Sequence, residues 1–493
     1  MRSTSLQKWL LASLSMAALV FAPAAATAQG SPNPASCGTK IAQRLPELMQ
    51  RYDVAGLGLA LIERGEVTWM SSWGTANGSR PLEQDALFRV ESISKPVTAW
   101  GVMRLVERGA VDLDAPVAGY LKGWSFPPSG RSTTSITVRE LLTHTAGLPL
   151  GDFSARFDPR APVPDLRSHL TVEARPIGAA STHFMYSDTG FNLLELLIEE
   201  VSGERFADFM RREVLSPLGM TSARFEWTPG LAKKIPEGHD LNGAAVPFYV
   251  YPAHASGGLL ATVSDVARFA QAGLSPAFRS DHQVLEDSSI ALLHAPQVPT
   301  GGPLRFVSPA YGLGHFVEPL SDGRRSVWHG GQGYGWMSHF QIIPDSGDGI
   351  VLLSNSQRAW PLFAHVLRVW AECNLIAPVG MTRIRYVIGA VWAIILSASA
   401  ICAALLLGLV FGRRERPRVL ARLTPTSRLG RFLLAGLSVA LASLLLWARA
   451  QPYLFLASVA PHAMRPLWIA LVFLAVVLAL AAVLPRRDAV LPS

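Results

Sequence analysis

The pattern of hydrophobic and polar positions divides the chain into three parts. A short apolar run, Trp9–Phe21, follows two basic residues near the N-terminus, and long apolar runs without charge lie at the C-terminal end. Residues 29–382 between them mix strand-like alternation with helical spacing, as a folded domain does. We therefore expect a leader, a folded domain and a membrane-associated segment.

Strand-like runs lie at both ends of the folded domain. Val54–Ile62 and Glu66–Trp73 surround the turn Glu63-Arg64-Gly65, which is a hairpin pattern. Helical spacing dominates the middle, and Ser264-Asp265 is the expected N-cap of its last helix. Because the strands come from distant segments, one sheet with an inserted helical lobe is expected. The further predicted strands are 326–329, 336–343 and 349–354, and the predicted helices are 41–51, 97–107, 138–142, 191–201, 264–272 and 361–373.

The N-terminal segment, residues 1–28, has the features of a secretory signal. Arg2 and Lys8 precede the apolar run, and Ala26-Thr27-Ala28 matches an Ala-x-Ala cleavage site. The alternative is an uncleaved anchor helix, but the apolar core is short for a bilayer. Cleavage after Ala28 is therefore the prediction.

Residues 383–493 are predicted to form a membrane anchor with three helices, at about 386–411, 430–448 and 467–484. The loop 412–431 carries seven arginines against the single Glu415, which places it on the cytoplasmic side. The domain at 29–382 then lies on the exported side. We expect a protein of the cell membrane, partnered with lipid, whose domain faces the periplasm or the cell exterior.

The net charge of +8 does not indicate a nucleic-acid partner, because the basic residues concentrate in the leader and the anchor. The exported domain by itself is mildly acidic. His-Glu-x-x-His, Cys-x-x-Cys and phosphate-binding glycine motifs do not occur in the sequence, so no metal and no cofactor is predicted.

Two cysteines bracket the exported domain. Cys37 lies at its start and Cys373 at its end, in a compartment where disulfides persist. We predict that they are bonded, with two unrelated buried thiols as the alternative. Cys402 falls inside the first predicted membrane helix.

The tetrad Ser92-Ile93-Ser94-Lys95 is the leading catalytic candidate. At a spacing of i and i+3, Ser92 and Lys95 share one face of a helix. A serine needs a base beside it to become a nucleophile, and a partly desolvated lysine can serve.

Further patterns accompany this tetrad in a fixed order. They are Leu141–Pro149, Tyr186-Ser187-Asp188, Ser216–Met220, Ser256–Leu259 and His329-Gly330-Gly331. With these patterns in this order, the chain resembles the serine β-lactamase and penicillin-binding protein family, in its class C-like branch, over about residues 37–375. The resemblance implies an α+β fold, with an antiparallel sheet flanked by helices and an inserted, mostly helical lobe. It also implies a serine hydrolase acting on a small molecule or a peptide.

The resemblance assigns roles to individual residues. Ser92 becomes the acylated nucleophile at a helix N-terminus, Lys95 shares the proton transfer, and Tyr186 becomes the base. The backbone N–H groups of Ser92 and Gln332 form the oxyanion hole. Gly330 and Gly331 leave the strand edge open to substrate.

Two positions depart from the family pattern. His329-Gly330-Gly331 replaces Lys-Thr/Ser-Gly, which removes a permanent cation that grips a substrate carboxylate. Asp188 stands where the family has asparagine, so it can accept hydrogen bonds but not donate them. It can also pair with Lys95 and raise the pKa of the lysine, or face a substrate amine. We expect His329 in the pocket and His144 in a structural role.

These patterns predict a membrane-anchored serine hydrolase that acts through an acyl-enzyme on an ester or peptide in the cell envelope. The alternatives are a DD-carboxypeptidase or weak β-lactamase and, from another class, a non-catalytic binding or sensor module. The loops 151–180 and 296–309 are expected to shape specificity.

Overall fold

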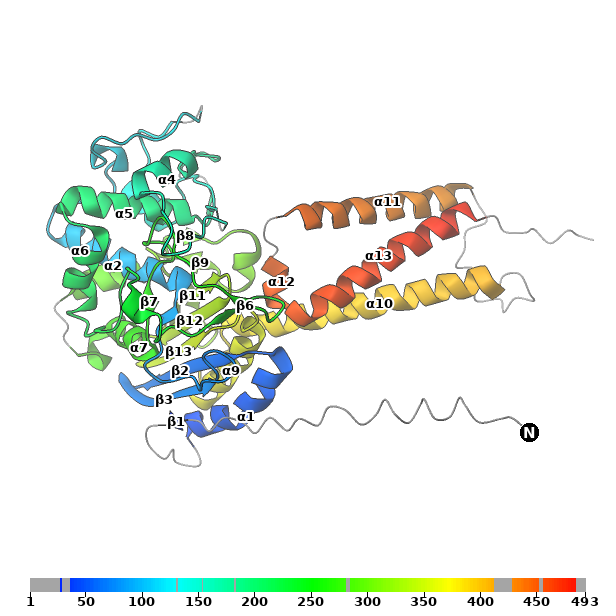
Figure 1. The fold of residues 1–493 in the computed structure, drawn as a ribbon, viewed down its shortest axis with the longest axis horizontal. Helices are drawn as coiled ribbons and strands as arrows, with labels where there is room; N and C mark the ends of the chain where they lie inside the picture. The colour runs from blue at the N-terminus through cyan, green and yellow to red at the C-terminus, as the bar shows by residue number, and fades with distance from the viewer. Residues whose placement is uncertain are drawn as a thin grey trace, which may run out of the picture.

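The computed structural model describes residues 27–28, 36–129, 132–152, 154–180, 183–280, 284–411, 428–451 and 455–484. Most of the predicted leader and most of the arginine-rich loop lie outside these residues, so cleavage and orientation stay predictions. The described chain has a folded body from which three long helices extend side by side (Figure 1).

The centre of the body is one nine-stranded sheet in which all neighbouring strands are antiparallel. Strands from the two ends of the domain meet in its middle, where Ile62 pairs with Gly349 and Leu57 with Ser354. The strands in spatial order are β1 (Thr27–Ala28), β3 (Glu66–Gly74), β2 (Gly56–Glu63), β13 (Asp348–Ser354), β12 (Trp336–Ile343), β11 (Arg325–Gly333), β10 (Phe316–Pro319), β9 (Ala310–Tyr311) and β8 (Val298–Pro299).

Helices cover both faces of this sheet, because its central strands alternate apolar side chains on each face. Leu57, Leu59 and Leu61 of β2 pack in one core with α1 (Cys37–Tyr52) and α9 (Trp360–Cys373). Ala60 and Ile62 belong to a second core on the opposite face, which contains α2 (Ser94–Glu107) and α7 (Val263–Ala272).

The segment between β4 (Phe88–Arg89) and β7 (Leu260–Ala261) forms the helical lobe above the second face (Figure 1). Its helix α5 (Asp188–Ser202) begins at the last residue of the Tyr186-Ser187-Asp188 motif, and Ser187 is its N-cap. The further elements of the body are α3 (Val138–Leu142), α4 (Leu166–Glu173), α5 (Asp188–Ser202), α6 (Phe206–Met210), α8 (Asp287–Leu293), and the two-stranded sheets of β4 (Phe88–Arg89) with β7 (Leu260–Ala261) and of β5 (Gly238–His239) with β6 (Ala245–Val246).

The expected N-cap of α7 is wrong by two residues. Thr262 caps this helix by accepting the Asp265 N–H at 3.1 Å, and the Asp265 carboxylate accepts the Thr262 N–H at 2.9 Å. This reciprocal capping box satisfies two N–H groups, which a cap at Ser264 cannot do.

Three helices at the C-terminal end are long and apolar enough to cross a bilayer: α10 (Ile384–Phe411), α11 (Arg428–Ala450) and α13 (Pro461–Val483). The last of these begins before the predicted 467 and runs through Pro466. Its first turns contact the body, where Arg465 donates to Asn242 at 3.1 Å. Ile384 of α10 and Val459 of the short helix α12 (Phe455–Val459) join the core beneath α1 and α9. The helices α10 and α13 are therefore packed onto the folded body, and α11 packs against α13.

Candidate active site

The candidate nucleophile lies in a strained turn between β4 and α2. Glu91, immediately before Ser92, has φ of +50°, a left-handed conformation that is costly for a side chain of this size. Its buried carboxylate accepts hydrogen bonds from Arg89 at 2.9 Å, Tyr249 at 3.2 Å and Tyr251 at 3.1 Å. These contacts hold the turn so that Ser92 stands at its tip and leads directly into α2.

Lys95 lies one turn later and is fully buried beneath Ser92. Its Nζ donates to Ser92 Oγ at 3.0 Å and to the Ser256 carbonyl oxygen at 2.8 Å, and lies 2.5 Å from Asp188 Oδ1. These three partners match the three N–H groups of an ammonium. Burial by itself lowers the pKa of Lys95, but the charge of Asp188, together with interactions with Asp188 and Tyr186, raises that pKa above its ordinary value. Lys95 is therefore an ammonium in the resting site.

Tyr186 completes the group around the serine hydroxyl. Lys95 Nζ lies 4.9 Å from its ring centroid, and both Ser92 and Lys95 act on the pKa of its phenol. Burial raises the pKa of Tyr186 above its ordinary value, although the charge of Lys95 opposes this. The predicted trio of Ser92, Lys95 and Tyr186 is thus brought together, with the lysine charged and the phenol neutral.

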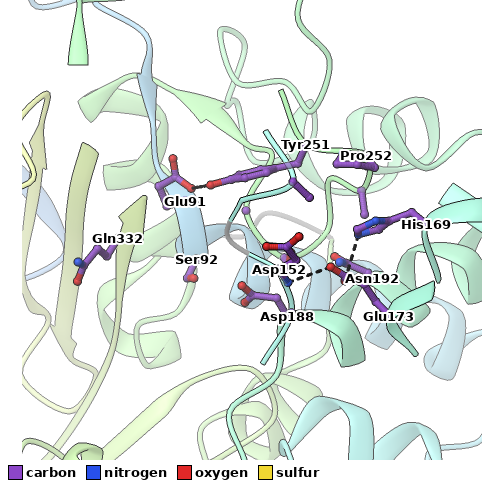
Figure 2. Close-up of a pocket in the computed structure, with 15 residues that line it drawn as sticks. Glu91, Ser92, Asp152, His169, Glu173, Asp188, Asn192, Tyr251, Pro252 and Gln332 are labelled. Atoms are coloured by element: carbon purple, nitrogen blue, oxygen red, sulfur yellow. Dashed lines mark hydrogen bonds and ion pairs between the residues drawn. The ribbon is translucent and has the colours of Figure 1, made fainter. Parts of the chain in front are cut away.

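The edge of β11 forms the opposite wall, where Gln332 lies across Ser92 from Asp152 with its side chain directed away from Ser92 (Figure 2). Trp360 donates to Gln332 Oε1 at 2.9 Å, while Gln332 Nε2 is buried without a partner among the described residues. The Gln332 side chain is thereby held through its Oε1 atom, and its Nε2 group has no acceptor among the described residues.

Two of the three glycines of this strand, Gly330 and Gly331, are required by close packing. A Cβ at Gly331 would overlap the carbonyl oxygen of Val90, and a Cβ at Gly330 would overlap the Trp360 ring. They allow β11 to approach the nucleophile turn and α9 closely. Neither lines the pocket, so they do not directly clear space for a substrate.

His329 is not in the pocket, which corrects the sequence-based expectation. Its side chain is fully buried, with Nδ1 2.8 Å from the Gly330 carbonyl oxygen and Nε2 3.2 Å from the Tyr311 hydroxyl. Burial, and then the charge of Lys95, lower the pKa of His329 well below its usual range. A neutral imidazole behind the wall supplies no cation for a substrate carboxylate.

His144 has the structural environment that was expected. Its Nδ1 accepts the backbone N–H of Ser187 at 3.1 Å, and its ring lies 4.4 Å from that of Tyr186. It therefore positions the segment that carries Tyr186.

The pocket beside Ser92 has a wall that sequence reasoning missed. It is formed by Asp152 and by His169 and Glu173 of α4, together with Asn192 of α5 (Figure 2). Helical spacing could have flagged Asn192, because it lies four residues after Asp188 and so on the same helix face. The loop 151–180 thus lines the pocket, as expected, whereas none of the described residues of 296–309 does so.

Among the described residues, no three His, Cys, Asp or Glu side chains are grouped to hold a metal ion. Cys37 and Cys373 are free thiols, not a disulfide, but they are in contact. Burial, and then a hydrogen bond with Cys373, raise the pKa of Cys37. Their proximity agrees with the expected pairing, and the bond itself stays a prediction.

Comparison with known proteins agrees with this arrangement. The Beta-lactamase family model matches residues 41–370. Penicillin-binding protein 4* of Bacillus subtilis is 35% identical over 184 residues, 36% of this chain and 39% of that protein, so the match spans about two fifths of this relative. Esterase EstB of Burkholderia gladioli is 26% identical over 65% of this chain and 91% of its own length.

A solved structure has the same fold. The octameric penicillin-binding protein homologue from Pyrococcus abyssi superposes with a TM-score of 0.60 at 25% identity, over 69% of this chain and 78% of that one. The α+β fold with its antiparallel sheet is thereby confirmed. Taken with the family match over two thirds of the sequence, these findings show that the chain belongs to the beta-lactamase family and is a serine hydrolase.

Proposed function

We propose that this protein is a membrane-anchored hydrolase of the cell envelope that cleaves an ester or amide through an acyl-enzyme on Ser92. The convergence of Lys95 and Tyr186 on the Ser92 hydroxyl is the observation that supports it most. A serine hydroxyl held by two proton-transfer groups is the arrangement that nucleophilic catalysis requires.

The reaction follows from the contacts of these groups. Lys95 and Tyr186 are both protonated at rest, so the pair must first release one proton to solvent, and the remaining proton is shared between the amine and the phenolate oxygen. Ser92 Oγ then bonds to the substrate carbonyl carbon while its proton passes to Tyr186. The tyrosine returns that proton to the departing alcohol or amine as the scissile bond breaks. Water releases the acyl group by the same sequence.

The developing oxyanion is assigned to the backbone N–H groups of Ser92 and Gln332. This assignment comes from the family pattern, and the position of Gln332 on the pocket wall supports it.

The surroundings of the pocket favour substrates without a carboxylate near the scissile bond. His329 is neutral and lies behind the wall, and the carboxylates of Asp152 and Glu173 line the other side. Repulsion and desolvation therefore disfavour a substrate anion. An ester or amide fits this better than the alternative activity, a DD-carboxypeptidase or weak β-lactamase.

Three apolar helices, two of which contact the body, support anchoring in a bilayer. The arginine-rich loop supports an exported position for the body, because such loops stay on the cytoplasmic side.

The test uses the full-length protein in detergent, as wild type and Ser92→Ala, incubated with a fluorophosphonate and, separately, with a penicillin. We expect a covalent fluorophosphonate adduct by intact-mass spectrometry, lost in Ser92→Ala, and little penicillin adduct. Efficient adducts from both reagents would instead favour the carboxypeptidase alternative. No adduct from either reagent would overturn the acyl-enzyme proposal.

A further inference from the structure

The wall of the pocket formed by α4, α5 and the loop before α4 has a composition that the hydrolase chemistry does not use. Figure 2 shows Asp152, Glu173, His169 and Asn192 gathered on one side of Ser92, away from Gln332. We call the space between Asp152, Glu173 and Asn192 the amine subsite. The inference about it rests on the proposed function, because its ligand is part of the substrate acylating Ser92.

The carboxylates of the pocket differ in how far they are neutralised. Glu91 is paired with Arg89 at 2.9 Å, and Asp188 with Lys95 at 2.5 Å. Both are therefore compensated by a permanent cation.

Asp152 and Glu173 have no such partner in the described part of the chain. Glu173 contacts His169 at 3.1 Å, which is an ion pair only when the imidazole is protonated, and it accepts the backbone N–H of Asp152 at 2.9 Å. Ser154 donates to Asp152, and these hydrogen bonds, followed by the charges of His169 and Arg156, lower the pKa of its carboxyl. Neither carboxylate is thus in an ion pair with a lysine or arginine among the described residues.

Asn192 provides an independent indication that a ligand is missing. The residue is 4% exposed, and its Oδ1 atom is buried with no hydrogen-bond partner among the described residues. An unsatisfied buried carbonyl oxygen is costly, so the space beside it favours a ligand with a hydrogen-bond donor. Asp152 and Glu173 line the same pocket wall, and carboxylates attract a donor that carries positive charge.

A primary ammonium has the chemistry that satisfies all three groups. It carries one positive charge and three N–H donors, which match two carboxylates and one amide oxygen. We propose that the amine subsite binds a protonated primary amine on the acyl part of the substrate. The substrate class is therefore an aminoacyl ester or amide, including peptides with an unblocked amine.

The position of the subsite limits where that amine can be. Asn192 lies four residues along α5 from Asp188, about 6 Å of helix rise, and Asp188 contacts the lysine that touches Ser92. An amine close to the acyl carbonyl and an amine on a longer side chain would lie at different distances from Ser92, and each could be the ligand of the subsite. The test separates these two sources.

The test uses two fluorophosphonates that differ only at the chain end, a primary amine or its N-acetyl derivative, each made with a short and a long chain. The full-length protein in detergent is labelled, and the second-order rate of adduct formation is followed by intact-mass spectrometry. We expect the amine to label about tenfold faster than the acetylated probe, the effect of one charge-assisted hydrogen bond. A preference confined to the short or the long chain identifies which amine is recognised.

Variants assign the preference to the subsite. In Asp152→Asn and Glu173→Gln we expect the ratio of the amine rate to the acetylated-probe rate to fall to about one. A wild-type Tm shows that each variant remains folded. Glu204→Gln, which removes an equal charge from an exposed carboxylate paired with Arg212, is the control and should keep the preference.

The outcomes separate this inference from the proposed function. If both probes label Ser92 at equal rates, the subsite is not specific for amines, while the acyl-enzyme proposal stands. If the preference persists in both subsite variants, the recognition lies elsewhere and the inference is wrong. If neither probe labels Ser92, the proposed function itself fails.

Discussion

Lys95 Nζ lies 2.5 Å from Asp188 Oδ1, and both side chains are largely shielded from water. The carboxylate occupies the position where relatives in the family pattern have a neutral asparagine. A lysine that shares its charge with a buried carboxylate is a weak base. The pair therefore sets the pH at which Ser92 can be activated.

We predict that Asp188→Asn moves the pH dependence of acylation to lower pH. Without the carboxylate, burial remains as the main influence, and it lowers the pKa of Lys95. More of the enzyme then has a neutral amine near pH 7. Fluorophosphonate labelling measured across pH should show its midpoint fall by about one unit or more.

The control for this experiment is Asp208→Asn, which removes an exposed carboxylate paired with Arg205 and Arg211 and should leave the midpoint unchanged. An unchanged midpoint in Asp188→Asn would show that the ion pair does not set the protonation of Lys95.

Gly331→Ala should disable the site through the backbone. The new methyl would overlap the Val90 carbonyl oxygen and Ser338 Oγ, neither of which can move without shifting the nucleophile turn. Overpacking of this kind costs about 1–3 kcal/mol. We expect a lower Tm and a labelling rate reduced by about tenfold or more.

Gly230→Ala serves as the matched control, since its Cβ meets nothing within 4 Å. Wild-type labelling by Gly331→Ala would mean that β11 can retreat without disturbing Ser92.

Glu318 should make the folded domain less stable as the pH rises. Burial raises the pKa of its carboxyl from 4.5 to about 7, so the folded protein holds this proton where the unfolded chain has released it. That contribution is present at acidic pH and is lost as the pH rises through 7. Glu318→Gln should therefore raise Tm by about 2 °C or more at pH 8, and less at pH 5.

Thermal unfolding at the two pH values tests this, with the exposed Glu47→Gln as the comparison. An equal effect of Glu318→Gln at both pH values would show that Glu318 does not titrate in this range.

The Cys37–Cys373 pair should form a disulfide when the protein is produced in an oxidising compartment and purified from it. Intact mass without reductant should then be lower by two hydrogen atoms, and Cys37→Ser should cost about 2–4 kcal/mol of stability. Cys402→Ser should leave the mass difference unchanged, because Cys402 lies in α10, away from the pair. Alkylation of both thiols in the unreduced, unfolded protein would contradict the prediction.

Much of the architecture could be predicted from local patterns, since β2, β3 and α9 each have clear periodicity over at least seven residues. The strands β8, β9 and β10 could not be predicted, because each has two to four residues and exists only through its neighbours.

The residues of the candidate site could also be predicted only in part. Ser92, Lys95 and Tyr186 belong to contiguous motifs and could be assigned, and the Lys95–Asp188 contact was foreseen as an option. The position of His329 could not be predicted, because the side on which a strand residue lies depends on register, and Tyr311 on a missed strand determines its surroundings. Asp152 and Glu173 could not be predicted, because the path of a long loop decides whether they reach the pocket.

The pairing of β2 with β13 sets the order of events when this protein is made. The sheet remains without its central ladder until the chain has been synthesised through residue 354, although the first strands leave the ribosome early. Such non-local pairing makes folding slow compared with helical proteins of equal size. The sheet can consequently be completed only after most of the chain has been made. A chain truncated before β13 lacks the strand that joins β2 to β12.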